Sequence, residues 1–217
     1  MTPAHHPGEA WLMDYALGNL DQPFEAVLRA HVGVCASCRD TIAFAERLGG
    51  EIVHALPGRP VAFDARAICD HHEQETPRPQ AVSRAHGIAV TDDIERCVET
   101  YLDSSLDALP WRGVGQGLRL CRLGEQADAR TWLLRGKPGT VLPHHTHAGS
   151  ELTLVLKGAY FCGDRIYRAG DIEDADESTA HQPVITRDGE CICLAVTEGR
   201  LRFRDLLPRL VQPLLGI

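Results

Sequence analysis

Residues 139–158 read GTVLPHHTHAGSELTLVLKG, and this stretch decides the fold of the C-terminal half. His145 and His147 are two positions apart, so on a β-strand both imidazoles point to the same side. Glu151 opens the apolar run ELTLVL, which predicts the next strand, and Gly158 follows that run at a turn. Imidazole and carboxylate groups are common metal ligands. We therefore predict that His145, His147 and Glu151 reach one metal ion inside a β-barrel.

A fourth ligand is expected further along the chain, and His181 lies eleven residues after Gly170. Three imidazoles and a carboxylate suit Zn²⁺, Fe²⁺, Mn²⁺ or Ni²⁺, and geometry chooses among them. The alternative is a set of histidines that only pack or face solvent. His144 falls on the opposite strand face from His145, so we expect it to be exposed and not a ligand.

The histidine stretch lies within a series of short apolar or alternating runs broken by glycines. From about Trp111 these runs predict an antiparallel sandwich or barrel. The pattern Gly-x5-His-x-His-x3-Glu-x6-Gly is similar to the first part of the cupin signature. The second part departs from it, with Asp176-Glu177 in the region of the usual Pro-x-Gly and Ile185 where Asn is common. The resemblance implies an all-β cupin domain, a double-stranded β-helix or jelly roll, over residues 108–217.

The N-terminal half has the periodicity of helices. The run EAWLMDYALGNL predicts a first helix that ends at Gly18-Asn19, and Asp21 can cap a second helix with Pro23 in its first turn. A third helix is predicted over Ser37–Leu48, ended by Gly49-Gly50, and a weaker fourth from Val61 to about Glu75. The Pro-containing stretch 76–90 predicts a linker, and Asp92–Leu106 a short helix. We expect a four-helix domain over residues 1–80, and a linker with a short helix over 81–107.

The helical half carries a second candidate metal site. The stretch HVGVCASC places His31, Cys35 and Cys38 four and three residues apart, and on a helix these offsets share one face. The Cys-x-x-Cys spacing can also span a helix start, where backbone N–H groups favour thiolates. Two thiolates and an imidazole are typical of zinc, and a fourth ligand could come from His5 or His6. The alternatives are a redox Cys-x-x-Cys pair, or two cysteines that only fill the core. A metal would stabilise a small domain with few bulky residues.

The motif His-x-x-x-Cys-x-x-Cys on short helices resembles that of zinc-binding anti-sigma factors. Together with the cupin pattern, the whole chain is similar to the ChrR family of cupin-bearing anti-sigma factors, including the segments GDIEDADES, CICLA and LRFRDLLPRLVQPLLGI. The resemblance implies an extracytoplasmic-function (group IV) sigma factor as partner, released in response to singlet oxygen or related oxidants such as organic peroxides. It also implies zinc in both domains, with ligands His6, His31, Cys35 and Cys38 in the first and His145, His147, Glu151 and His181 in the second.

Charge and hydrophobicity argue against several classes of function and location. The net charge of −8 argues against direct binding to nucleic-acid phosphates, which needs a basic surface. The apolar runs are far shorter than the roughly 20 residues of a membrane span. The N-terminus lacks the basic and apolar regions of a signal peptide, so we expect a cytoplasmic protein.

Two rival functions remain open from the sequence. Three histidines and a glutamate in a cupin also build dioxygenases and isomerases, and a metal or small-ligand sensor with another partner protein is a third possibility.

Cys191 and Cys193, two positions apart on a predicted strand, are either sensing thiols or, more commonly, small core residues.

Overall fold

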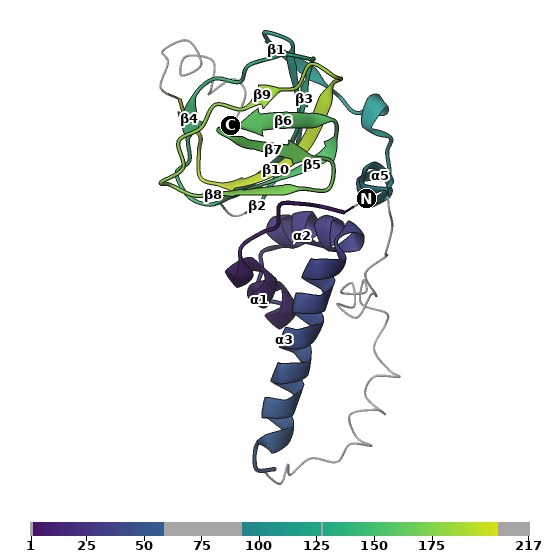
Figure 1. The fold of residues 1–217 in the computed structure, drawn as a ribbon, viewed down its shortest axis with the longest axis vertical. Coiled ribbons are helices and arrows are strands. Elements are labelled where there is room, and N and C mark those ends of the chain that lie inside the picture. The colour runs from purple at the N-terminus through teal and green to yellow at the C-terminus, as the bar shows by residue number, and fades with distance from the viewer. Residues whose placement is uncertain (1, 59–92, 127, 204–217) are drawn as a thin grey trace, which may run out of the picture.

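The structure is a computed structural model that describes residues 2–58, 93–126 and 128–203. Within these residues, helices α1, α2 and α3 at the N-terminus are followed by helix α5 and then by a β-barrel (Figure 1). The arrangement confirms the predicted fold class of a helical part followed by a cupin jelly roll. The predicted fourth helix, Val61 to about Glu75, and the predicted linker 76–90 lie outside the described residues.

The first two helices begin and end where the sequence indicates. Helix α1 spans Glu9–Leu17 and ends at Gly18, whose φ of 68° lies in the left-handed region that glycine adopts readily. Helix α2 spans Gln22–Val34, with Pro23 in its first turn. Cys35 ends α2 and caps α3, so the second candidate metal site lies at the junction of two helices.

Helix α3 is longer than predicted. It spans Ala36–Ala55 and passes through Gly49-Gly50, where the sequence pattern placed its end. Each glycine costs a helix only about 1 kcal/mol relative to alanine, which does not by itself end a helix. The helix stops instead at Leu56, in front of Pro57, because a residue before proline disfavours the helical conformation. Helix α3 therefore projects well beyond the rest of the molecule (Figure 1).

The short helix before the barrel is confirmed with narrower bounds. Helix α5 spans Ile94–Leu102, and the Asp93 side chain accepts a hydrogen bond from the Arg96 backbone N–H at 3.0 Å. Asp103, at φ 50°, ends it. A 3-10 turn, Leu106–Ala108, then leads into the first strand.

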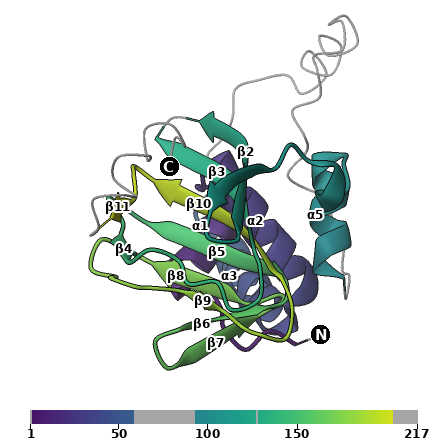
Figure 2. The same cartoon turned by 90° about the horizontal axis from the view of Figure 1, so that it is seen from above.

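The barrel consists of antiparallel strands in three sheets. The largest has the order β1-β2-β3-β10-β5-β8, and the two smaller ones are β11-β4 and β7-β6-β9. The strand bounds are β1 Arg112–Gly115, β2 Leu118–Gln126, β3 Ala129–Gly136, β4 His145–Thr146, β5 Glu151–Lys157, β6 Ala159–Cys162, β7 Arg165–Arg168, β8 Ile172–Ala175, β9 Val184–Ile185, β10 Cys191–Glu198 and β11 Arg202–Phe203. Figure 2 shows the strands from above, with helices α1, α2 and α3 beneath them and α5 at the side.

The six-stranded sheet has two apolar faces, because side chains alternate along each strand. On β10, Cys193 and Ala195 point into the barrel, whereas Leu194 and Val196 belong to the core on the other face. Helix α2 covers that outer face with its own buried residues, among them Leu28. The helices and the barrel thus share one hydrophobic core.

The N-terminal segment also runs along strand β8. The backbone N–H of His5 donates to the Asp171 carboxylate at 3.1 Å, and the Ile172 N–H donates to the His5 carbonyl at 3.2 Å. Asp174 accepts hydrogen bonds from the Gly8 N–H at 2.9 Å and from the Trp11 indole at 3.1 Å. Helical part and barrel are therefore held together by polar as well as apolar contacts. Within the described residues, no helix is both long and apolar enough to cross a membrane.

Candidate metal centres

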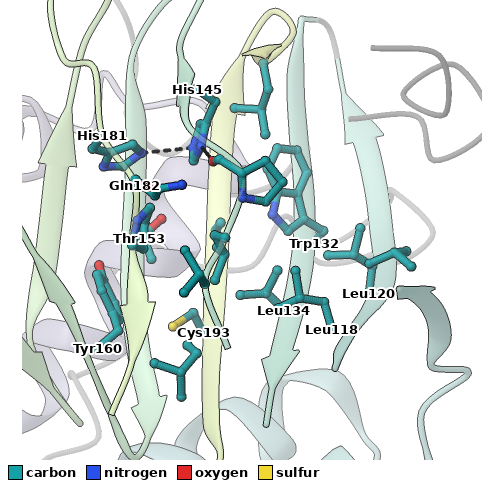
Figure 3. Close-up of a pocket in the computed structure, with 18 of the residues that line it drawn as sticks. Leu118, Leu120, Trp132, Leu134, His145, Thr153, Tyr160, His181, Gln182 and Cys193 are labelled. Atoms are coloured by element: carbon teal, nitrogen blue, oxygen red, sulfur yellow. Dashed lines mark hydrogen bonds between the residues drawn. The ribbon is translucent and has the colours of Figure 1, made fainter. Parts of the chain in front are cut away.

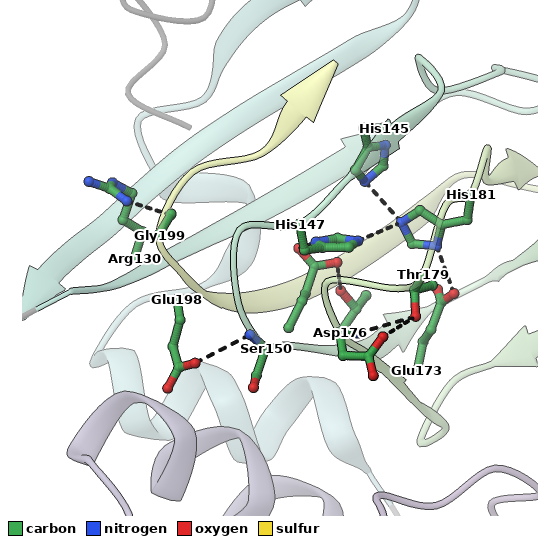
Figure 4. Close-up of polar contacts among 12 residues, drawn as sticks. Arg130, His145, His147, Ser150, Glu173, Asp176, Thr179, His181, Glu198 and Gly199 are labelled. Carbon is green, nitrogen blue, oxygen red and sulfur yellow. Dashed lines mark hydrogen bonds and ion pairs between the residues drawn. The ribbon is translucent and has the colours of Figure 1, made fainter. Parts of the chain in front are cut away.

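The barrel brings the four predicted ligands of its site together. Strand β4 supplies His145, and His147 follows immediately; Glu151 begins β5, and His181 pairs with His145 through an isolated bridge. All four side chains are buried, and their ligand atoms lie within 4.8 Å of one another. The Nε2 atom of His181 lies 2.9 Å from Nε2 of His145 and 3.1 Å from Nε2 of His147 (Figure 4).

Hydrogen bonds fix which nitrogen is free in the rings of His145 and His181. Nδ1 of His145 lies 2.9 Å from the Pro143 carbonyl, and a carbonyl only accepts, so Nδ1 must donate. Nδ1 of His181 lies 2.9 Å from the Glu173 carboxylate and donates to it. Burial lowers the pKa of His145 to about 4, so this ring is neutral at pH 7 and its Nε2 carries a lone pair.

This arrangement fits a metal ion. With both Nδ1 atoms committed as donors, Nε2 of His145 and Nε2 of His181 are two acceptors 2.9 Å apart, which cannot hydrogen-bond to each other while both rings are neutral. A cation between them would turn this repulsion into attraction, and Glu151 would supply a compensating negative charge. The residues therefore suit a divalent metal better than an apolar core.

Glu173, which the sequence analysis did not identify as a site residue, holds His181 in place. Its two carboxylate oxygens accept from Nδ1 of His181 at 2.9 Å and from the Tyr160 hydroxyl at 2.5 Å. Burial alone would raise the pKa of Glu173, but the hydrogen bonds from His181, Cys162 and Tyr160 hold it below its usual value. The alternation of the strand IEDA could have indicated this role, because Glu173 lies two residues before the buried Ala175 and therefore on the same strand face.

We expect Glu173→Gln to weaken metal binding in the barrel by about 10- to 100-fold, the usual effect of losing a group that orients a histidine ligand. His181 and Tyr160 donate to different oxygens of the carboxylate, and a glutamine replaces one of these oxygens by an NH₂ donor, so one of the two contacts would be lost. A competition titration with a chelator measures the affinity. The matched control is Glu177→Gln, a change at an exposed carboxylate of the neighbouring loop. Equal affinities in the two variants would contradict the assigned role.

The helical part brings the other four predicted ligands together as well. Nε2 of His31 lies 3.3 Å from Sγ of Cys38, and Nδ1 of His6 lies 3.4 Å from Sγ of Cys35 and 3.5 Å from Sγ of Cys38. Bonds of about 2.3 Å to sulfur and about 2.0 Å to nitrogen at tetrahedral angles place S and N roughly 3.5 Å apart. The ligand atoms thus have the spacing of a tetrahedral zinc site.

The sequence leaves open whether His5 or His6 joins this group, and the two side chains have different surroundings in the structure. Nε2 of His5 lies 3.1 Å from the Ile166 carbonyl, and its ring packs on Tyr167 at 4.5 Å, so His5 is committed to the barrel. His6 instead faces the two thiols. Nδ1 of His31 donates to the Gly170 carbonyl at 2.7 Å, which leaves its Nε2 for a metal.

Burial sets the protonation of this group when no metal is bound. It lowers the pKa of His31 to about 4 and, with the neighbouring Cys35, raises the pKa of Cys38 to about 12. The imidazole is therefore ready to bind a cation, and the thiol must release a proton to do so.

Three other residues discussed from the sequence have definite places. His144 is half-buried, with an Nδ1 atom that has no hydrogen-bond partner, so the expectation that it is exposed was wrong. The reason is that the chain around it runs as a loop closing the barrel, with only His145 and Thr146 in strand geometry. Cys191 and Cys193 are buried side by side, with sulfur atoms 3.6 Å apart, in a cluster with Val155 and Tyr160.

Comparison with known proteins places this architecture in a family. Over 220 residues, the chain is 35% identical to the anti-sigma-E factor ChrR of Cereibacter sphaeroides, and the match spans the full length of both proteins. The chain belongs to the ChrR family of anti-sigma factors. Residues 103–201 match the domain family described as the ChrR cupin-like domain. The family is one of anti-sigma factors and not of enzymes, which removes the dioxygenase and isomerase alternatives.

A solved structure of the ChrR family has the same fold across both parts. The crystal structure of Rhodobacter sphaeroides SigE in complex with the anti-sigma ChrR matches 90% of this chain and all of that chain, with 32% identity and a TM-score of 0.72. The family resemblance seen in the ligand motifs therefore extends to the whole arrangement of helices and barrel.

Proposed function

We propose that this protein is an anti-sigma factor that sequesters an extracytoplasmic-function (group IV) sigma factor. The observation that carries the proposal is an apolar stripe on α3, where Phe44, Leu48 and Ile52 recur every four residues and are each more than half exposed. Residues at this spacing lie on one face of a helix. A helix that projects from the body with such a face is typical of a protein–protein binding surface. The ChrR of the matched structure is in complex with SigE.

The exposure of this stripe is not a general property of the surface. Over the described residues, most of the large exposed apolar side chains gather on α1 and α3, with Met13 and Leu17 on α1 and Val53 and Leu56 near the end of α3, while Tyr101 lies on α5. The barrel exposes only scattered ones, such as Val141 and Phe161. The partner surface therefore belongs to the helical part, which we assign to residues 1–80, with 81–107 as a connection and 108–217 as the cupin domain.

We further propose that His6, His31, Cys35 and Cys38 bind zinc, and that His145, His147, Glu151 and His181 bind a second ion, zinc or else iron, manganese or nickel. The tetrahedral spacing of the first set and the convergent Nε2 atoms of the second support this. The protein acts in the cytoplasm, where sigma factors meet RNA polymerase, and binds neither nucleic acid nor membrane directly.

Release of the sigma factor is proposed to follow singlet oxygen or related oxidants such as organic peroxides. Thiolates and metal-bound groups are targets of such oxidants. For a signal to cross from the barrel to the helices, the oxidised barrel must favour a state with lower affinity for the sigma factor.

Strand β8 and the residues just before it support this coupling, because they contact both ligand sets. The Gly170 carbonyl accepts from the ligand His31, while Glu173, three residues later, positions the ligand His181. Between them, Asp171 holds the backbone of residues 4 and 5, next to His6. A displacement of β8 would thus act on both sites at once.

We expect the double change His145→Ala and His147→Ala to leave sigma binding at rest intact but to abolish release by oxidant. The stripe on α3 is distant from the barrel ligands, so its partner contacts persist. Binding before and after oxidant is measured by co-purification of the full-length chain with its sigma factor. His144→Ala is the matched control and should respond as the unaltered protein does. Normal release from the double variant would remove the barrel metal from the mechanism.

A further inference from the structure

The barrel contains a cavity that extends well beyond the candidate metal ligands. Its volume is about 500 Å³, within the range of roughly 300–1,000 Å³ that holds small organic ligands. One wall carries Leu118, Leu120, Trp132 and Leu134 (Figure 3), and Phe203 of β11 also lines the cavity. His145, Glu151 and His181 open onto the same space, so the metal ligands form part of its lining.

The cavity is chemically two-sided. Figure 3 places the leucines and Trp132 on one side and His145, His181, Thr153 and Tyr160 on the other. Within the described part of the chain, neither lysine nor arginine lines it. Two of the polar side chains there are already engaged, since Thr153 donates to Glu151 at 3.1 Å and Tyr160 donates to Glu173. Gln116 and Gln182 also line the cavity, but their amides carry no charge. A charged head group could therefore be neutralised only by the metal.

The space is a consequence of small side chains on one strand. Position 195 on β10 is alanine, between Trp132 of β3 and Thr153 of β5, its partners in the sheet. A larger residue there would fill the interior, as Ile192, Leu194 and Val196 do on the opposite face of the same strand. The barrel is thus packed tightly towards the helices and left open inside.

We propose that this cavity is a binding site for an amphipathic organic acid, with its carboxylate on the barrel metal and its apolar tail against Leu120, Trp132 and Leu134. The proposal rests on the metal centre proposed above. Some zinc sites expand from four-coordinate to five-coordinate, and the carboxylate would supply that additional ligand. The apolar wall would add the affinity of a buried tail, at about 25 cal/mol per Å² removed from water.

The test is a calorimetric titration of the full-length, zinc-loaded protein with decanoate, acetate and 1-decanol. We expect decanoate to bind once per chain and at least 10-fold more tightly than either of the others, because only decanoate has both head and tail. Leu134→Gln, a change at a half-buried wall position, should weaken decanoate at least 10-fold without altering the zinc content. The matched control is Leu17→Gln on exposed α1, which should change neither.

The outcomes separate this proposal from the function on which it rests. Equal binding of decanoate and acetate would show that the tail finds no site, and equal binding of decanoate and 1-decanol would show that the metal does not hold the head; either overturns the proposal. Should Leu134→Gln fail to fold, the three ligands on the unaltered protein still decide. Zinc content is measured independently, and the sigma factor takes no part. Loss of the metal centre itself would appear as a chain that binds only one zinc ion.

Discussion

Replacing both Cys35 and Cys38 by serine should abolish the binding of the sigma factor. The two thiolates would hold zinc at the junction of α2 and α3, and their loss removes a metal whose binding supplies on the order of 10 kcal/mol of folding free energy in small zinc domains. The cluster around them is small, with Leu12, Val32 and Ile42 as its other buried members. Without the metal, we expect α1 and α3 to lose their fixed packing and the apolar stripe to lose its geometry.

The measurement combines zinc content, helix content by circular dichroism and sigma affinity. The full-length variant should bind one zinc ion fewer, lose helical signal and bind the sigma factor at least 100-fold more weakly. Cys97→Ser is the matched control, since Cys97 is a half-buried cysteine on α5, away from both ligand sets. A double variant with unchanged sigma affinity would exclude zinc from the inhibitory mechanism.

The second large effect is expected at the stripe on α3. Burying a phenylalanine or leucine against a partner contributes about 1.5–3 kcal/mol each, so loss of two such contacts is expected to weaken binding by roughly 100-fold or more. Phe44→Asp with Leu48→Asp should therefore abolish the complex at micromolar concentrations. Because both side chains are exposed, we expect the thermal stability and zinc content of the free protein to stay the same.

The control for this surface is Phe161→Asp on β6, a phenylalanine that is 47% exposed on the barrel, compared with 57% for Phe44. It makes the same chemical change outside the proposed partner surface. Sigma affinity measured by titration should be unaffected by Phe161→Asp and lost in the α3 variant. Equal affinities in the two variants would show that the stripe is not the contact surface.

The grouping of most candidate ligand residues was predictable because their spacing in the sequence is short. His145 and His147 share one side of an extended segment by the two-residue repeat. His31 and Cys35 are close in sequence, but they meet where α2 ends and α3 begins and not on one helix face. The position of His181 is harder to predict from the sequence. It depends on a bridge to His145 across 36 residues, and such a bridge leaves no local sequence pattern.

Other features depend on tertiary contacts that a sequence does not display. The choice of His6 over His5 follows from the contact of His5 with Tyr167 and the Ile166 carbonyl. The role of Glu173 follows from the distance of its carboxylate to His181. The shared core of α2 and the barrel was not expected either, because the composition of residues 76–90 suggested two separate units. Leu28 on α2 and Leu154 on β5 belong to that one core.

The most direct test of the central claim is a pull-down of the tagged full-length protein from its own cells, before and after exposure to oxidant, with the bound proteins identified. Our account predicts a group IV sigma factor in stoichiometric amount at rest, and its loss after oxidant. The absence of any sigma factor in both states would contradict the account.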